Sequence, residues 1–144
     1  FKLFDEFLEI KAGQEVHFEL GRALVGQTGS LITRALYIKN GKKKNFVVLD
    51  AGMTELMRPA LYQAYHKIEN LSQSGVESQE SEVVKYDIVG PICESTDCFG
   101  KEVEQPTSFR GDIFAIRSAG AYGEVMASKY NLRDAIRSVY SNEI

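Results

Sequence analysis

The chain has 144 residues, of which 44% are hydrophobic and 26% charged, and its formal net charge at pH 7 is −3. This length predicts one domain that buries roughly two-thirds of its unfolded surface, and the acidic balance argues against nucleic acid as a partner. No apolar run approaches the roughly 18 residues of a membrane span, so no membrane partner is expected. The two cysteines, five residues apart, form neither a disulfide framework nor a paired-cysteine metal motif, which favours a reducing, cytoplasmic compartment.

The first 20 residues predict a helix followed by a strand. Phe1, Phe4, Phe7 and Leu8 repeat at helical spacing, so an amphipathic helix is predicted over residues 1–11. Residues 15–20 predict a short strand. Because no capping residue precedes Phe1, we expect this sequence to be cut from something longer.

A β-hairpin is predicted after this segment. A turn over residues 26–29 leads into the β-prone run 30–38. Asn40-Gly41 and the three lysines after it predict an exposed hairpin tip. The returning run 46–49 is continuously apolar, which predicts a strand buried on both faces.

A short helix and a long loop are predicted next. Thr54 is the predicted N-cap of a helix that contains Pro59. Residues 64–71 predict another strand. Residues 72–82 are rich in serine, glutamine and glutamate, so they predict an exposed loop.

Reactive side chains gather between residues 90 and 100. Residues 83–89 alternate polar with apolar and predict a strand. Gly90-Pro91 ends it, because proline has no N–H to donate to a ladder. The residues up to Gly100 then hold two thiols, two carboxylates and two hydroxyls, on a loop that a sheet can position. A polar turn with a buried cysteine is the structural alternative.

The remaining residues complete a β-rich pattern. A turn over 109–112 precedes a buried strand over 113–116. Residues 118–123 are small, so their backbone can approach a ligand or a neighbouring segment closely. Residues 136–140 predict a last strand. Six to nine strands with a few short helices predict a mainly β fold, an antiparallel β-sandwich or Greek-key barrel.

Four segments at predicted strand ends place small residues around a reactive one. They are Glu19-Leu20-Gly21-Arg22, Arg58-Pro59-Ala60-Leu61-Tyr62, Cys93-Glu94-Ser95-Thr96-Asp97 and Gly120-Ala121-Tyr122-Gly123. In this order and spacing they resemble the C-terminal half of the diaminopimelate decarboxylases, which are pyridoxal-phosphate enzymes of the alanine-racemase-like type. The resemblance covers nearly the whole chain, and the Arg-Pro-Ala-Leu-Tyr and Gly-Pro-x-Cys-Glu-Ser motifs are specific to this branch.

The resemblance implies a two-domain subunit and a homodimer whose active sites are shared between subunits. Residues 1–20 would be the last helix and strand of a (β/α)8 barrel, and residues 21–144 the C-terminal β domain. The barrel would carry the lysine that binds pyridoxal 5'-phosphate, since no lysine here matches that motif. The enzyme would convert meso-2,6-diaminopimelate to L-lysine and CO2, and this part alone would be inactive.

The resemblance also implies a role for each site residue. Arg22 and Arg58 would bind the distal carboxylate of the substrate, because guanidinium forks match carboxylate geometry. Tyr62, one helical turn after Arg58, would add a hydroxyl, and Glu94 would pair with the distal ammonium. Cys93 would enter the partner subunit's site and position a proton at the carbon that loses CO2.

Other positions carry supporting or structural interpretations. Tyr122 and Gly21 would contact the cofactor, and no metal ligands are expected. Asp97 would order its loop by accepting backbone hydrogen bonds, whereas Cys98 is interpreted as packing. The family usually has Glu-Pro-Gly-Arg where this chain has Glu19-Leu20-Gly21-Arg22, so this turn should be less rigid.

Two alternatives remain open from the sequence. The first is a decarboxylase of a related diamino substrate of the carboxynorspermidine type, against which the Arg58 motif argues. The second is a non-catalytic β-barrel module for binding or dimerisation. The absence of a cofactor lysine fits that module as well as it fits a truncated enzyme.

Overall fold

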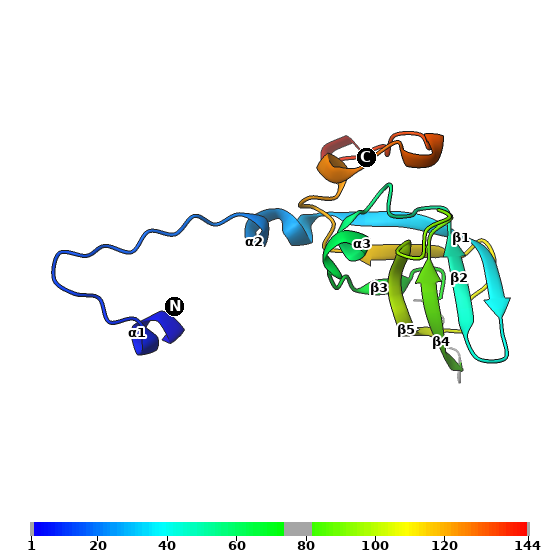
Figure 1. The fold of residues 1–144 in the computed structure, drawn as a ribbon, viewed down its shortest axis with the longest axis horizontal. Helices are drawn as coiled ribbons and strands as arrows, with labels where there is room; N and C mark the ends of the chain where they lie inside the picture. Colours follow the sequence, from blue (N-terminus) through cyan, green and yellow to red (C-terminus); the bar gives the residue numbers. More distant parts are fainter. Residues whose placement is uncertain (1, 74–81, 144) are drawn as a thin grey trace.

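The computed structural model describes residues 2–73 and 82–143, so most of the loop predicted over 72–82 lies outside the described residues (Figure 1). The fold is mainly β, as predicted. Its described strands are β1 (Ser30–Asn40), β2 (Asn45–Leu49), β3 (Ile68–Asn70), β4 (Val83–Val89), β5 (Cys98–Pro106) and β6 (Ile113–Arg117). Its described helices are α1 (Lys2–Phe7), α2 (Arg22–Val25), α3 (Arg58–Tyr62) and the 3-10 turns η1 (Gly26–Thr28), η2 (Glu124–Met126), η3 (Tyr130–Leu132) and η4 (Ser141–Glu143).

The strands form one sheet in the order β3-β6-β1-β2-β4-β5. Four of the neighbouring pairs are antiparallel, but β2 and β4 are parallel, which departs from the purely antiparallel sheet expected. A parallel pair needs a long crossover. Here the connection passes through α3 and β3, which lies at the opposite edge of the sheet, before the chain returns to β4.

The side chain of Gln105 bridges the two edge strands, so the sheet nearly closes into a barrel. Its Nε2 donates to the carbonyl of Ile68 at 2.8 Å, and its Oε1 accepts the N–H of Asn70 at 3.1 Å. Asn70 in turn donates to Asp112 at 2.8 Å. Buried polar groups are costly without partners, and this network satisfies several of them at the closure of the barrel.

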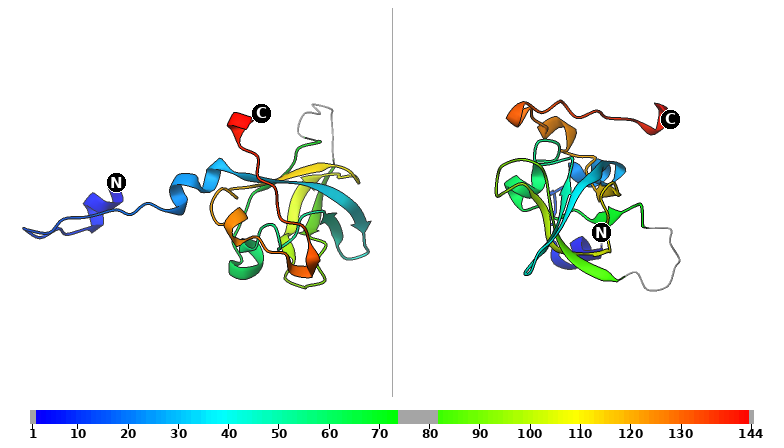
Figure 2. Two further views of the ribbon diagram at one scale, coloured as in Figure 1. Left: turned by 90° about the horizontal axis from the view of Figure 1, so that it is seen from above. Right: turned by 90° about the vertical axis from the view of Figure 1, so that its right-hand side faces the viewer.

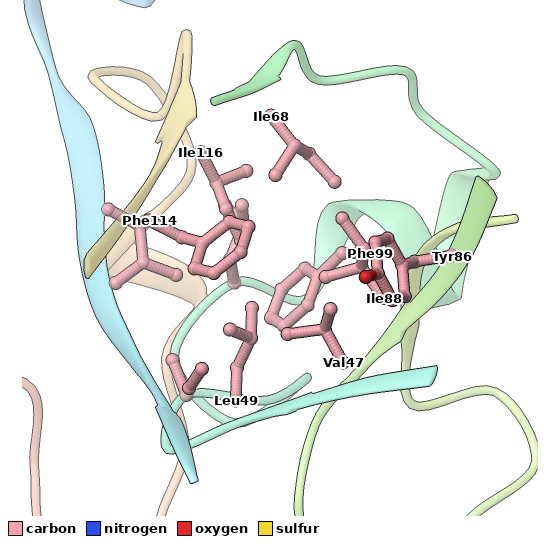
Figure 3. Close-up of a cluster of buried hydrophobic side chains, with 12 residues drawn as sticks. Val47, Leu49, Ile68, Tyr86, Ile88, Phe99, Phe114 and Ile116 are labelled. Carbon is pink, nitrogen blue, oxygen red and sulfur yellow. The ribbon is translucent and has the colours of Figure 1, made fainter. Parts of the chain in front are cut away.

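The inward faces of the strands form the core (Figure 3). Along β1, Leu31, Thr33 and Ala35 are buried while their neighbours are exposed, which is the period of two expected of a strand with one covered face. In β2, Val47 and Leu49 are fully buried but the alternate residues are only partly covered. The prediction that residues 46–49 are buried on both faces is therefore wrong for one face.

Several sequence predictions differ from the structure. No described strand includes residues 15–20 or 136–140, both predicted as strands. The first of these segments extends away from the sheet as an arm that ends in α1 (Figures 1 and 2), where no ladder can form. Thr54 does not cap α3, because the helix begins four residues after it. The hydroxyl of Thr54 donates to the carboxylate of Glu55 instead.

Strand β5 was not predicted, and pairing with β4 creates it. Its sequence carries Gly100, Lys101, Glu102 and Glu104, which obscure the β pattern. Glu102 has a positive φ of 52° at an irregularity in the β4–β5 register, and its N–H donates to Asp87 at 2.9 Å.

None of the helices in residues 2–73 and 82–143 has the length and apolar character needed to cross a bilayer.

Candidate active site

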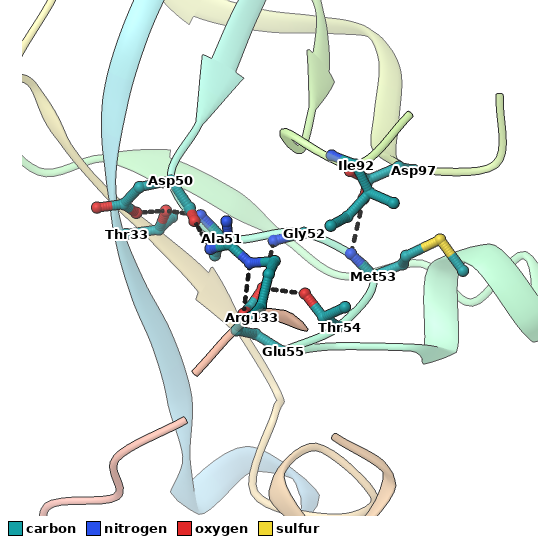
Figure 4. A network of polar contacts seen from close by, with 10 residues as sticks. All are labelled: Thr33, Asp50, Ala51, Gly52, Met53, Thr54, Glu55, Ile92, Asp97 and Arg133. Carbon is teal, nitrogen blue, oxygen red and sulfur yellow. Dashed lines mark hydrogen bonds and ion pairs between the residues drawn. The ribbon is translucent and has the colours of Figure 1, made fainter. Parts of the chain in front are cut away.

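The loop between β4 and β5 is braced by the buried carboxylate of Asp97, which is 4% exposed. Its two oxygens accept the N–H groups of Met53 at 2.6 Å and Ile92 at 2.7 Å (Figure 4). A Cβ at Gly90 would lie 2.3 Å from this carboxylate, so only glycine fits there. The prediction that Asp97 orders its loop is confirmed, and the structure adds a cross-link to the loop after β2.

Burial raises the pKa of Asp97, and the charge of Glu55 adds to this, although the two N–H donors act in the opposite direction. The carboxyl therefore occupies its position against a desolvation penalty. The position of this carboxyl therefore depends on the backbone N–H groups around it.

The loop over residues 50–55 is anchored on three sides. Asp50 accepts the hydroxyl of Thr33 on β1 at 2.5 Å, and the N–H of Met53 donates to Asp97 of the β4–β5 loop at 2.6 Å. From the C-terminal segment, Arg133 donates to Glu55 at 3.2 Å and to the carbonyl of Asp50 (Figure 4). This loop is thus the support that β1, the β4–β5 loop and the C-terminal segment share.

Cys93 and Glu94 are exposed on the braced loop. The hydroxyl of Tyr130 donates to Glu94 Oε1 at 2.7 Å. This hydrogen bond and the charge of Glu94 raise the pKa of Tyr130, and Cys93 contributes a smaller effect in the same direction. Cys98 differs from Cys93: it begins β5, is half-buried, and its pKa is raised by burial. A buried thiol with a raised pKa is unreactive, which supports its interpretation as packing.

Arg58 lies at the start of α3 between two aromatic rings. Its guanidinium carbon is 5.5 Å from the ring centre of Tyr62 and 5.8 Å from that of Tyr122. Its Nε is buried and has no hydrogen-bond partner among the described residues. A buried donor without an acceptor costs roughly 1–3 kcal/mol, so an anion bound at this place would gain a ready partner. Tyr62 lies one helical turn after Arg58 on the same side of α3, as predicted, and the substrate-binding roles of both residues remain predictions.

The small-residue segment 118–123 carries Tyr122 and positions it beside Arg58. Gly120 packs on the end of α2 and on η1: its N–H donates to the carbonyl of Gly26 at 3.0 Å, and a Cβ on Gly120 would lie 2.2 Å from the carbonyl oxygen of Val25. Tyr122 has a positive φ of 59°, which costs a non-glycine residue energy and often marks functional sites. The close approach predicted for this segment is therefore to a neighbouring backbone.

The structure brings the predicted site residues into two groups. Arg58, Tyr62 and Tyr122 form one, and Cys93 and Glu94 form the other; no hydrogen bond or ion pair joins the groups within the described ranges. Arg22 and Gly21 are exposed at the start of α2 and contact neither group through such bonds. Tyr130 was not predicted as a site residue, because it is 36 residues from Glu94 and no motif links them.

The fold and these motifs agree with one protein family. Residues 10–120 match the family model described as the pyridoxal-dependent decarboxylase C-terminal sheet domain. The chain belongs to this family. The resemblance deduced from the motifs is thereby confirmed.

Individual relatives carry the same similarity. The chain is 56% identical over 137 residues to the diaminopimelate decarboxylase of Bacteroides thetaiotaomicron, covering 95% of this chain and 34% of that protein. It is similar to the solved diaminopimelate decarboxylase of Helicobacter pylori complexed with L-lysine, with a TM-score of 0.68, 46% identity and coverage of 78% of this chain and 26% of that one. A lysine/ornithine decarboxylase of Vibrio vulnificus shares the fold at 19% identity and a TM-score of 0.66. The chain spans about a third or less of the length of these relatives.

The residues present fit the cofactor that the family name implies. Pyridoxal phosphate is a planar aromatic group, and the half-exposed aromatic side chain of Tyr122 can pack on such a group. The guanidinium of Arg58, 5.8 Å from the Tyr122 ring centre, stays available to an anionic group of a substrate bound beside the cofactor.

Proposed function

We propose that this chain is the sheet-domain part of a pyridoxal-phosphate-dependent decarboxylase that converts meso-2,6-diaminopimelate to L-lysine and CO2, a step of lysine biosynthesis. The observation that carries this proposal is the buried Nε of Arg58, which has no hydrogen-bond partner among the described residues and lies beside the rings of Tyr62 and Tyr122. The 56% identity to a diaminopimelate decarboxylase supports the choice of substrate.

In this proposal, residues 1–20 belong to a preceding barrel domain and residues 21–144 form the sheet domain. The exposure of nearly the whole arm over residues 6–20, including Phe7 and Leu20, supports a covering surface outside the sheet domain. The enzyme is a cytoplasmic homodimer, and the lysine that holds the cofactor lies outside this chain.

The chain's own residues bind and orient the substrate. Arg58 and Arg22 take the distal carboxylate, and the Tyr62 hydroxyl adds a hydrogen bond to it. Glu94 pairs with the distal ammonium. The two ends of meso-2,6-diaminopimelate carry the same groups and differ only in configuration, so the relative positions of the groups that bind the distal carboxylate and the distal ammonium select which end reacts.

The reacting end depends on Cys93, Tyr122 and Gly21. Pyridoxal phosphate, when bound, supplies the electron sink for breaking the carbon–carbon bond. Tyr122 and Gly21 contact the cofactor. Cys93, exposed on a loop that projects from β4 and β5, enters the other subunit's site and holds the proton destined for the carbon that loses CO2.

The test uses the full-length decarboxylase with Arg58→Ala. A hydrogen bond to a charged group is worth roughly 1.5–3 kcal/mol, so kcat/KM for diaminopimelate should fall about 10- to 100-fold. The loss should be much smaller for a diamino monocarboxylic acid that lacks the distal carboxylate. Arg110→Ala, at an exposed turn, is the matched control. An equal loss for both substrates would mean that Arg58 is structural.

A further inference from the structure

We propose that Tyr130 is a positioning residue that orients the Glu94 carboxylate toward the distal ammonium of a diamino substrate. The proposal rests on the proposed function for the role of Glu94. Its observation is independent of that function: the Tyr130 hydroxyl donates to Glu94 Oε1 at 2.7 Å, across two segments far apart in the chain.

Tyr130 is held in place by anchors on both sides. Before it, the N–H of Ser128 donates to the carbonyl of Thr54 at 2.9 Å. After it, Arg133 donates to Glu55 at 3.2 Å. Both anchors attach to the 50–55 loop, the same loop that Asp97 ties to the Cys93-Glu94 loop. Donor and acceptor of the Tyr130–Glu94 bond are therefore mounted on one common support.

The turn after Tyr130 is strained in a way that local burial does not explain. Asn131 and Leu132 have positive φ values of 57° and 58°, which L-residues seldom adopt in succession. Leu132 is 98% exposed, so no packing of its side chain offsets this conformation. Such strain persists where the surroundings over-determine the backbone, and it concentrates at functional positions.

The hydrogen bond leaves Glu94 prepared for an ammonium group. Tyr130 occupies Oε1, and Glu94 forms no ion pair with any residue in 2–73 or 82–143, so Oε2 remains available to a cation. A phenol O–H bound to a carboxylate is a strong, directional donor. The phenol keeps that proton at neutral pH, because the ordinary pKa of tyrosine is about 10 and the hydrogen bond to Glu94 raises the pKa of Tyr130 further.

The first test compares two substrates in the full-length decarboxylase. Tyr130→Phe removes only the donor, so KM for diaminopimelate should rise about five- to tenfold, the size of one modest hydrogen bond, with little change in kcat. KM for 2-aminopimelate, which lacks the distal amino group, should not change. Tyr65→Phe, an 87% exposed tyrosine, is the matched control. No change, or the same change for both substrates, would overturn the proposal.

The second test needs no turnover. In the full-length protein carrying isotope-labelled tyrosine, the Tyr130 resonance is assigned with Tyr130→Phe and titrated with pH. Glu94→Gln should move the pKa of Tyr130 down toward its ordinary value, and an unchanged pKa would overturn the contact itself. A wild-type protein that does not turn over diaminopimelate would instead overturn the proposed function and the ammonium specificity with it.

Discussion

Two buried aspartates on neighbouring parts of the chain are stabilised against desolvation in different ways. Asp87 lies within β4 and Asp97 ends the loop that follows it; they are 7% and 4% exposed. Each accepts backbone N–H groups, but Asp87 also accepts a 2.8 Å hydrogen bond from Lys44. Burial opposes the charge of both. At Asp87 the lysine and the Glu102 N–H outweigh burial and lower the pKa, whereas at Asp97 burial prevails and raises it.

The difference separates a carboxylate that supports the sheet from one that supports the candidate site. The Asp87–Lys44 pair joins β4 to the turn between β1 and β2, and the charge of Lys44 balances that of Asp87. Among residues 2–73 and 82–143, no cation donates a hydrogen bond to Asp97, which accepts the N–H groups of Met53 and Ile92 instead. The position of the Cys93-Glu94 loop therefore depends on backbone geometry, and it should respond more strongly to substitution.

The largest expected effect is that of Asp97→Ala. It leaves two buried N–H groups without acceptors, at roughly 1–3 kcal/mol each before relief of the carboxylate's own desolvation, so local opening should become easier by about 2–3 kcal/mol. Amide hydrogen exchange at Met53 and Ile92 in the full-length protein measures it. Asp134→Ala, at an exposed position, is the control. Unchanged protection at both amides would show that Asp97 does not brace the loop.

A smaller loss is expected from Gly90→Ala. The added methyl group would meet the Asp97 carboxylate at 2.3 Å and the Cα of Gly52 at 2.5 Å. Overpacking of this kind costs about 1–3 kcal/mol, which should appear as a lower Tm of the full-length protein. Gly26→Ala is the control: Gly26 has helical dihedral angles, and among the described residues its added methyl group would meet only the Cγ of Arg22, at 3.4 Å, so Tm should stay nearly unchanged. Equal Tm values for the two variants would contradict the close packing around Asp97.

The smallest effect is a pH dependence of opposite sign at the two aspartates. The folded pKa of Asp87 is lowered, so its stabilisation is present above the unfolded value of about 3.9 and is lost as pH falls through the folded value. The folded pKa of Asp97 is raised, so its contribution is largest below about 3.9 and falls as pH rises through the folded value.

Thermal unfolding of Asp87→Asn and Asp97→Asn against wild type, between about pH 3 and pH 7, compares the two contributions. As pH falls, the Tm deficit of Asp87→Asn should shrink and that of Asp97→Asn should grow. Two Tm deficits that change in the same direction with pH would show that the two carboxylates do not differ in this way.

Local patterns were sufficient where one segment determines its own structure. The β-prone run of β1, the strand β4, the hairpin at Asn40-Gly41 and the placement of Tyr62 one helical turn after Arg58 were predicted from local patterns, and all are present. The alternation of polar and apolar residues in β4 does not appear in its burial, because Tyr86, Asp87 and Ile88 are buried in succession. The motifs also identified the family, because a motif is a set of residue types at fixed spacing and can be read directly from the sequence. The proposed roles of Arg22, Gly21, Cys93 and Glu94 come from the same motifs and remain predictions.

Tertiary structure alone decided the features that join distant segments. Residues 98–106 became a strand because β4 offers a partner, whereas residues 15–20 and 136–140, with β-prone sequences, lie in no described strand. The contacts from Asp97 to Met53 and from Tyr130 to Glu94 span 44 and 36 residues. Hydrogen bonds of this kind form where the folded backbone brings two distant groups together, and the spacing of residues within one segment does not predict that placement.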